Sequence, residues 1–254
     1  MLNHLDKRLK GANVLVTGGS SETGPFVCRA FAEAGANVAL TWHDDEQGAE
    51  TVAQKVRQEG VKAETYRFDL LDQGSIEQLC RSVRNDFDHL DVLVLVAGSV
   101  GLRNFRELSR KQLDVAIDGN VKGNLMLAKN LGYWMKDNDK SLGRIIQFSA
   151  QSADNPSHSA YGIAKKAQTD MADFLAWQLA PEVRVNTIQP IGIEQDPDAD
   201  EPDEDDAPLG RKVHARMCAR MCVLLCDEAF DSVTGQTIHM ESGRNVDSAY
   251  AEAL

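Results

Sequence analysis

Short apolar runs that suit β-strands alternate with longer amphipathic runs that suit α-helices along the whole chain. The predicted strands cover residues 12–17, 37–41, 64–68, 91–97, 144–148, 184–188 and 237–240. The predicted helices cover residues 25–34, 50–59, 75–87, 114–135, 161–179 and 214–226. Alternation of this kind builds a parallel sheet through right-handed crossovers. The pattern therefore predicts an α/β fold with a doubly wound parallel sheet, and the most apolar run, 91–97, should lie at its centre.

The chain is expected to form one domain over residues 1–254, with an acidic, lid-like insertion at 191–210. Its 254 residues and 43% hydrophobic content are enough for one large core. No apolar run is as long as a membrane span, and the charged N-terminus lacks a signal-peptide core. Five cysteines do not form a disulfide framework. We therefore expect a soluble protein of the reducing cytoplasm.

Negative charge is concentrated in one segment. The formal net charge is −12, and eight acidic residues lie between Asp196 and Asp206, so the remainder has 31 acidic against 27 basic residues. This balance argues against nucleic acid and membrane surfaces as partners. The acidic run fits a solvated loop, a lid that favours a cationic substrate or basic partner, or a calcium site without EF-hand spacing.

A glycine-rich turn joins the first strand to the first helix. The turn reads Gly18-Gly19-Ser20-Ser21-Glu22-Thr23-Gly24, and Pro25 suits the first turn of the helix after it. A strand, a glycine-rich turn and a helix together present backbone N–H groups to a phosphate. The alternative is a plain tight turn.

Tyr161 and Lys165 lie four residues apart in a predicted helix, so their side chains share one face. An ammonium beside a phenol favours the phenolate and lowers the phenol's pKa from about 10. Such a pair predicts an acid–base group usable near neutral pH. The alternative is an exposed pair with no chemical role.

Seven ordered motifs resemble those of the short-chain dehydrogenase/reductase family across nearly the whole chain. They are Thr17 to Gly24, Asp69 after the third strand, Ala97-Gly98, Asn120, the Tyr161 and Lys165 pair, and the stretches Arg184 to Pro190 and Val233 to Thr237. The resemblance implies a Rossmann-type fold and an NAD(P)-dependent oxidoreductase. The activity it implies interconverts a secondary alcohol and a ketone.

The resemblance also implies roles for individual residues. Tyr161 exchanges a proton with substrate, Lys165 lowers the pKa of Tyr161 and binds the nicotinamide ribose, and Asn120 holds a relay water. Ser149 is the expected catalytic serine. The implied cofactor-binding residues are Gly18, Ser20, Ser21, Thr23, Gly24, His43, Asp69, Leu70, Ala97, Gly98, Tyr161, Lys165, Pro190 and Ile193.

Several positions depart from the family pattern. Glu22 replaces the middle glycine of the turn, where it adds bulk and negative charge beside a pyrophosphate. Leu95 and Val96 replace a pair of asparagines that supply polar support. Gly192 lies one place late after Pro190, and Gln195 replaces a threonine that contacts the nicotinamide amide.

The position of the catalytic serine depends on the register after residue 148. Counting from Gly143 places Ala150 there, while Ser149 lies one residue before it and Ser152 two after it. We favour Ser149 narrowly over a lost serine. A lost donor costs about 100- to 1,000-fold in related chemistry.

Cofactor choice rests on the end of the second strand. Trp42 and His43 stand where an aspartate for NAD or an arginine for NADP would be expected, and Asp44 and Asp45 follow them. Two carboxylates repel a 2′-phosphate. We lean slightly to NAD over NADP.

A stripe of possible metal ligands recurs every four residues in the predicted late helix, at His214, Cys218, Cys222 and Cys226. The first and last are about 18 Å apart along a helix, so one tetrahedral ion cannot use all four. Packing of small thiols in the core is the better interpretation, and we expect no metal. His158, three residues before Tyr161, is interpreted as a loop residue.

Three functions remain open. The first is the oxidoreductase, expected to act on a small polar molecule. The second is a diverged, catalytically weak binding or partner subunit, which Glu22, Leu95, Val96 and Ala150 favour. The third is non-redox dehydration or isomerisation with Tyr161 as acid–base. The resemblance implies a homodimer or homotetramer, and the apolar runs at 214–226 and 237–240 are compatible with assembly.

Overall fold

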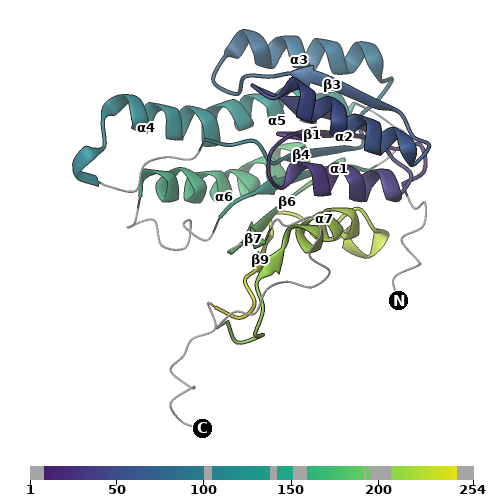
Figure 1. Cartoon of the computed structure of the whole chain (residues 1–254). Coiled ribbons are helices and arrows are strands. Elements are labelled where there is room, and N and C mark those ends of the chain that lie inside the picture. Colours follow the sequence, from purple (N-terminus) through teal and green to yellow (C-terminus); the bar gives the residue numbers. More distant parts are fainter. Residues whose placement is uncertain are drawn as a thin grey trace.

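Seven of the described strands form one parallel sheet, as expected. The computed structural model describes residues 9–99, 105–137, 142–150, 159–191, 193–194 and 207–244. Within them the seven-stranded sheet has the order β3-β2-β1-β4-β5-β6-β9 (Figure 1). Its strands are β1 (Asn13–Thr17), β2 (Asn37–Trp42), β3 (Ala63–Arg67), β4 (Val92–Leu95), β5 (Gly143–Phe148), β6 (Val183–Pro190) and β9 (Thr237–Met240). β4 lies at the centre, and the order reverses between β1 and β4, where such folds bind ligands.

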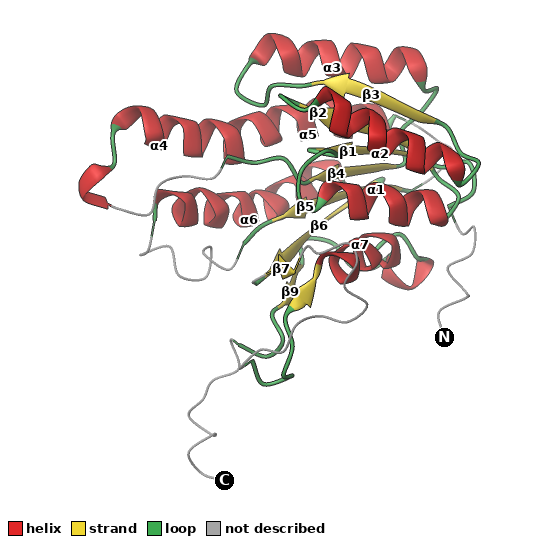
Figure 2. Ribbon diagram, viewed as in Figure 1, coloured by secondary structure: helices red, strands yellow, loops and turns green. Residues whose placement is uncertain are grey.

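Helices cover both faces of the sheet (Figure 2). One apolar core joins the sheet to α1 (Gly24–Glu33), α2 (Glu46–Gln58) and α7 (Ala215–Leu224). A second core joins the other face to α3 (Gln73–Asp86), α5 (Gly123–Lys136) and α6 (Ala160–Leu179). The helix α4 (Arg110–Ile117) precedes α5, and short 3-10 turns occupy Phe105–Glu107 and Glu228–Phe230.

Alternation along the central strands divides their side chains between the two cores. In β4, Val92 and Val94 belong to the core of α1, α2 and α7, while Leu93 and Leu95 belong to the other. Successive side chains of a strand point to opposite faces, so a fully apolar strand fits a sheet covered on both sides. This explains why the run at 91–97 predicted a central strand.

Several helices differ from the sequence-based expectations, and α2 begins four residues early, after the N-cap Asp45. α3 begins after Asp72, whose carboxylate accepts a hydrogen bond from the Gly74 N–H, so Ser75 is not its N-cap. The expected helix at 114–135 is interrupted by a π-helical turn at Asp118–Lys122. His214 precedes α7 as its N-cap, and its Nδ1 accepts from the Arg216 N–H.

A small parallel pair, β7 (Ile193–Glu194) with β8 (Val213–His214), lies beyond the end of β6. The acidic run from Asp196 to Asp206, which lies between these two strands in sequence, is outside the described residues. Among the helices that the structure describes, none is both long enough and apolar enough to cross a bilayer.

Candidate functional site

A hollow of about 400 Å³ opens beyond the carboxyl ends of the strands near the switch point. Eight residues expected to bind cofactor line it together: Gly18, Ser20, Ser21, His43, Asp69, Leu70, Ala97 and Gly98. Thr23 and Gly24 lie in the same turn, at the start of α1. The strand order and the βα turns bring these segments to one place although the chain separates them widely.

The glycine-rich turn is held by β2 and folded tightly on itself. Gly18 has a φ of +67°, and its N–H donates to Thr41 Oγ1 at 2.9 Å. A Cβ on Gly24 would lie 2.1 Å from the Gly18 carbonyl oxygen, so only glycine fits there. Glu22 is exposed, and the N-cap residue Thr23 makes no side-chain cap hydrogen bond, while the Gly24 N–H donates to Ser21 Oγ at 3.3 Å. The turn can therefore present backbone N–H groups to an anion.

Asp69 is fixed by a turn of its own. Its N–H donates to Ser75 Oγ at 2.8 Å, and its Oδ1 accepts from the Leu71 N–H at 2.9 Å. The His43 ring lies between two carboxylates, 3.1 Å from Asp44 Oδ2 and 3.5 Å from Asp69 Oδ2. Ser75 thus holds the acid after β3, a role that sequence reasoning missed.

Polar support for the end of β4 comes from outside that strand. The Ala97 N–H donates to Thr17 Oγ1 at 3.2 Å, and Asn124 Nδ2 donates to the Ala97 carbonyl at 3.3 Å. Leu95 is buried in the apolar core. Asn124 therefore offsets in part the loss of polar support expected at Leu95 and Val96. Sequence reasoning missed Asn124, although it lies four residues after Asn120 and so on the same face of the helix.

Asn120 lies in the π-helical turn and is fully buried. Its Nδ2 donates to the carbonyls of Ser99 and Ala116 at 2.8 and 2.9 Å. Its Oδ1 has no hydrogen-bond partner among the described residues and lies 2.5 Å from where a Cβ on Gly98 would be. A buried amide oxygen without a partner requires a donor, which a bound molecule or a water can supply.

Tyr161 and Lys165 share the first turns of α6, after Ser159 caps it through the Gly162 N–H. Lys165 Nζ lies 5.6 Å from the centre of the Tyr161 ring. It donates to the Phe148 carbonyl at 3.0 Å and to Gln168 Oε1 at 2.9 Å. Nζ also lies 3.3 Å from the Cβ position on Gly98, so Lys165 and Asn120 meet there.

Burial sets the pKa values of this pair. It lowers the pKa of Lys165 to about 8 and raises the pKa of Tyr161 above its ordinary value. The shift of Tyr161 is opposite to the lowering expected from Lys165. The reason is geometric, because the ammonium donates to Phe148 and Gln168, and desolvation of the phenol dominates.

Ser149 does not take the position expected of a catalytic serine. Its hydroxyl is 2.8 Å from Thr169 Oγ1 and donates to the Lys165 carbonyl at 3.2 Å. The side chain is buried between β5 and α6. The structure therefore does not support Ser149 as a substrate-facing donor, and Ala150 follows it at the strand end.

The remaining residues expected near the site either do not line the hollow or lie outside the described residues. Pro190 is the last residue of β6 and Ile193 the first of β7, and neither lines the hollow. Ser152, His158, Gly192 and Gln195 lie outside the described residues.

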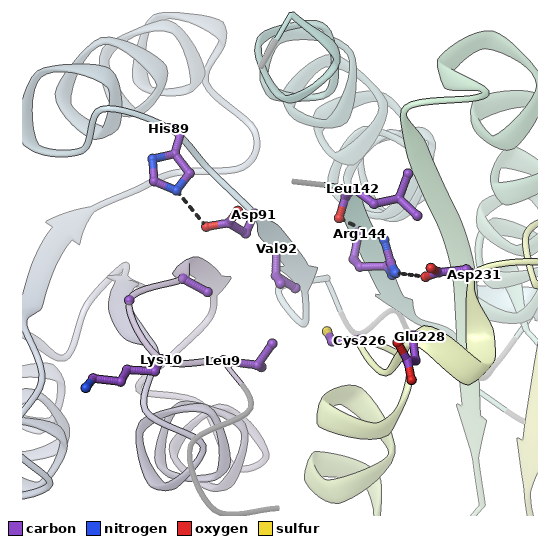
Figure 3. Close-up of a pocket in the computed structure, with 12 residues that line it drawn as sticks. Leu9, Lys10, His89, Asp91, Val92, Leu142, Arg144, Cys226, Glu228 and Asp231 are labelled. Atoms are coloured by element: carbon purple, nitrogen blue, oxygen red, sulfur yellow. Dashed lines mark hydrogen bonds and ion pairs between the residues drawn. The ribbon is translucent and has the colours of Figure 1, made fainter. Parts of the chain in front are cut away.

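A second hollow lies beside the amino ends of β1, β4 and β5, and Figure 3 shows the residues that line it. The buried Arg144 guanidinium pairs with Asp231 and donates to the Leu142 carbonyl at 2.8 Å. His89 Nε2 lies 3.1 Å from Asp91 Oδ2, which accepts from the Asn13 N–H. These charged groups are satisfied within the chain, so we interpret the hollow as structural.

The histidine and cysteine stripe is packing, as expected. Cys218 and Cys222 are buried in the core with α1, and His214 stacks edge-on against Phe26 at 5.5 Å. Burial raises the pKa of the Cys218 thiol to about 12, which disfavours the thiolate. Within the described ranges, no three potential ligands gather around one point.

Comparison with known proteins gives matches over nearly the whole chain. A family model described as enoyl-(acyl carrier protein) reductase matches residues 23–245. An NADP-dependent mannitol dehydrogenase of Hypocrea jecorina is 29% identical over 92% of each chain. Glucose 1-dehydrogenase 2 of Bacillus subtilis is 28% identical over 93% of this chain and 96% of its own. The crystal structure of an acetoin dehydrogenase from Salmonella typhimurium superposes with a TM-score of 0.81, at 28% identity, covering 92% of this chain and 96% of its own.

Proposed function

The chain belongs to the short-chain dehydrogenase/reductase family, and we propose that it is an NAD(P)-dependent oxidoreductase that interconverts a secondary alcohol and a ketone. The observation that carries this proposal is the convergence of Tyr161, Lys165 and Asn120 near Gly98. A phenol, an ammonium and an amide oxygen without a partner form a proton-transfer group beside a hollow that suits a dinucleotide.

The residues present fit a nicotinamide dinucleotide. The tight approach of Gly24 to Gly18 leaves room for a pyrophosphate at the start of α1. Gly98 keeps the space beside Asn120 Oδ1 open, because a side chain there would collide with that oxygen. When bound, the cofactor supplies the hydride donor or acceptor.

The chain's own residues handle the proton. The Tyr161 phenol donates its proton to a ketone oxygen in reduction and accepts one from an alcohol in oxidation. Lys165 has a free N–H to stabilise the phenolate or to bind the ribose. Asn120 Oδ1 fixes a water that connects the site to solvent. The raised pKa of Tyr161 keeps its proton in place near neutral pH, which favours the reductive direction.

We propose NAD as the preferred cofactor. Three carboxylates, Asp44, Asp45 and Asp69, line the adenosine side of the hollow. Its described lining contains no lysine or arginine. A 2′-phosphate would meet net repulsion there, whereas a ribose hydroxyl can donate to a carboxylate. The mannitol dehydrogenase relative is named as NADP-dependent, so this preference needs a direct test.

The substrate is proposed to be a small polar molecule, and the assembly a homodimer or homotetramer in the cytoplasm. The apolar run at 214–226 is compatible with assembly, but its buried residues Cys218, Ala219, Cys222 and Val223 pack within the chain's own core and are not available for an interface. Large apolar side chains are instead exposed on α6, at Ile163, Phe174 and Trp177. This face is the better candidate for self-association.

One observation favours the alternative of a catalytically weak member. Ser149 is engaged by α6, and Ala150 stands where counting from Gly143 places the substrate-facing serine. A site with no hydroxyl donor at that point would turn over slowly.

The deciding experiment is a titration of nucleotide-free protein with NADH and NADPH separately. Trp42 lines the hollow and serves as the fluorescent reporter, with Trp42→Phe as the control. Micromolar binding followed by ketone reduction that Tyr161→Phe abolishes supports the proposal. No binding of either cofactor at millimolar concentration contradicts it. Cofactor binding without turnover on any alcohol or ketone favours the weak member.

A further inference from the structure

Gln168 contacts the proposed catalytic lysine from inside the protein. It lies three residues after Lys165 on α6, is fully buried, and accepts a hydrogen bond from Lys165 Nζ through Oε1 at 2.9 Å. Nothing in the sequence pattern singled it out. Its carbonyl oxygen and that of Phe148 are the two acceptors that the described residues offer to the ammonium.

Counting donors shows what these contacts do. A lysine ammonium has three N–H groups. Gln168 and Phe148 take two of them, and the third remains on the side of Gly98, where Nζ borders the space that a Cβ would fill. The ammonium therefore has a fixed position and one free donor. Because this donor is already fixed, little conformational entropy is lost when a partner binds to it.

The geometry of Gln168 also carries a cost. Its Nε2 is buried and has no hydrogen-bond partner among the described residues. A buried amide that satisfies only its oxygen is worse for folding than an apolar side chain of the same size. The fold alone does not explain this glutamine, but a need for its oxygen does.

We propose that Gln168 is a positioning residue that fixes the Lys165 ammonium and directs its remaining N–H to the cofactor side of the cleft. That the free N–H faces a cofactor rests on the proposed oxidoreductase function. The hydrogen bond between Lys165 and Gln168 does not depend on that function. Gln168 does not touch the reacting atoms. It acts through Lys165.

The groups around Lys165 Nζ come from several elements. They are Tyr161 and Gln168 on its own helix, the Phe148 carbonyl from β5, and Asn120 across Gly98 from the π-helical turn. Of these four groups, only Tyr161 titrates. A change at Gln168 should therefore be visible directly in the titration of Lys165.

Two substitutions distinguish the effect of the Gln168 side-chain oxygen from the effect of its side-chain volume. Gln168→Met fills nearly the same space without an acceptor. Gln168→Glu keeps an acceptor and places a negative charge beside the ammonium. If Gln168 only fills space, the methionine variant should be the better tolerated of the two. If its oxygen matters, the glutamate variant should retain function better.

The first measurement needs no cofactor. It follows the side-chain Cε resonance of Lys165 with pH in protein labelled with ¹³C-lysine, assigned with Lys165→Met. We expect a pKa of about 8 in the parent protein, a lower value in Gln168→Met, and a value at least about one unit higher in Gln168→Glu. An unchanged pKa in both variants overturns the proposal.

The second measurement compares cofactor affinity with thermal stability. We expect Gln168→Met to bind the preferred cofactor about tenfold more weakly while unfolding at the same or a higher temperature, and Gln168→Glu to keep the parent affinity. Parent-like affinity in Gln168→Met overturns the proposal, as does a joint fall of affinity and stability. If the parent protein binds no cofactor, the proposed function fails, and the Lys165 titration still decides the role of Gln168.

Discussion

The Ser149 hydroxyl donates a hydrogen bond to the backbone carbonyl of Lys165 at 3.2 Å. Thr169 Oγ1 donates to the same carbonyl at 3.0 Å. Two hydroxyls, one from the end of β5 and one from α6, thus meet at the helical turn that carries the proposed catalytic lysine. Ser149 joins the sheet to this helix, and we propose that its role is structural.

Replacing Ser149 should therefore affect the fold more than the chemistry. Ser149→Ala removes one buried hydrogen bond and should lower the free energy of unfolding by about 1 kcal/mol. Thr169→Val, which removes the other hydroxyl with little change in volume, is the matched control and should cost a similar amount. Urea unfolding and kcat of the same preparations provide the measurement. A 100-fold loss of kcat in Ser149→Ala with parent stability would show that Ser149 is the substrate-facing donor after all.

Introducing a hydroxyl at the next residue should have the opposite outcome. Ala150→Ser places a donor where counting from Gly143 locates the family's serine, and it should raise kcat for ketone reduction by about tenfold or more. Cofactor affinity should not change, because the added hydroxyl acts on substrate. Steady-state kinetics with a shared ketone panel measure this, with Ala150→Val as the control for added volume. An equal rate in Ala150→Ser and the parent would show that another group already supplies the donor.

The Ser149 and Ala150 pair shows where sequence reasoning stops. The sequence predicted the order of strands and helices, because apolar periodicity is averaged over many residues. It could not decide between two adjacent small residues, because a shift of one residue along a strand exchanges its two faces. Only the contact with α6 identifies which face Ser149 occupies.

The π-helical turn and the role proposed for Gln168 could not be predicted from the sequence, for two other reasons. The insertion of a π turn at Asp118–Lys122 leaves the apolar pattern on both sides helical, so 114–135 looked continuous. Gln168 lies at an ordinary helical spacing from Lys165, and its value depends on being buried beside an ammonium. Burial of that pair is a tertiary property. The spacing of Tyr161 and Lys165 was itself a signal in the sequence, whereas Asn120 was proposed only from the family resemblance.

The carboxylates beside the hollow should determine cofactor preference. Asp44→Arg replaces a repelling charge with one that can pair with a 2′-phosphate, and it should shift the ratio of NADPH to NADH affinity upwards by about tenfold or more. Asp44→Asn, which only removes the charge, should shift the ratio less. Fluorescence titration of both cofactors on the three proteins measures the ratio. If the parent protein binds NADPH more tightly than NADH, the proposed preference for NAD is wrong.

Tyr161 should titrate at unusually high pH in the free protein. Burial raises the pKa of its phenol, so its phenolate should form only above the ordinary value of about 10. The ultraviolet difference between the parent and Tyr161→Phe during an alkaline titration isolates this phenol from the other tyrosines. Because the phenol stays protonated near neutral pH, ketone reduction should vary little with pH in that range. A phenolate signal from Tyr161 near pH 8 would show that Lys165, rather than burial, controls it.

Self-association should depend on the exposed apolar face of α6. Ile163, Phe174 and Trp177 are 52%, 55% and 82% exposed, and at 100° per residue they fall within about 60° of one another around the helix. Aromatic side chains exposed to this degree on one helix face are typical of an interface. α5 packs beside α6 and exposes a further aromatic side chain, Tyr133.

Trp177→Glu places a charge on this face and should convert an oligomer to a monomer with little loss of unfolding free energy, because the side chain is solvent-exposed in the single chain. Leu209→Glu, a matched change at a side chain that is 66% exposed in the segment before β8, should leave the assembly intact. Sedimentation velocity of the three proteins at one concentration measures this. A monomeric parent protein would contradict the proposed homo-oligomer. An oligomer that survives Trp177→Glu would move the interface away from α6, with the unpaired outer edge of β9 as the next surface to test, since β6 is the only described strand that pairs with β9.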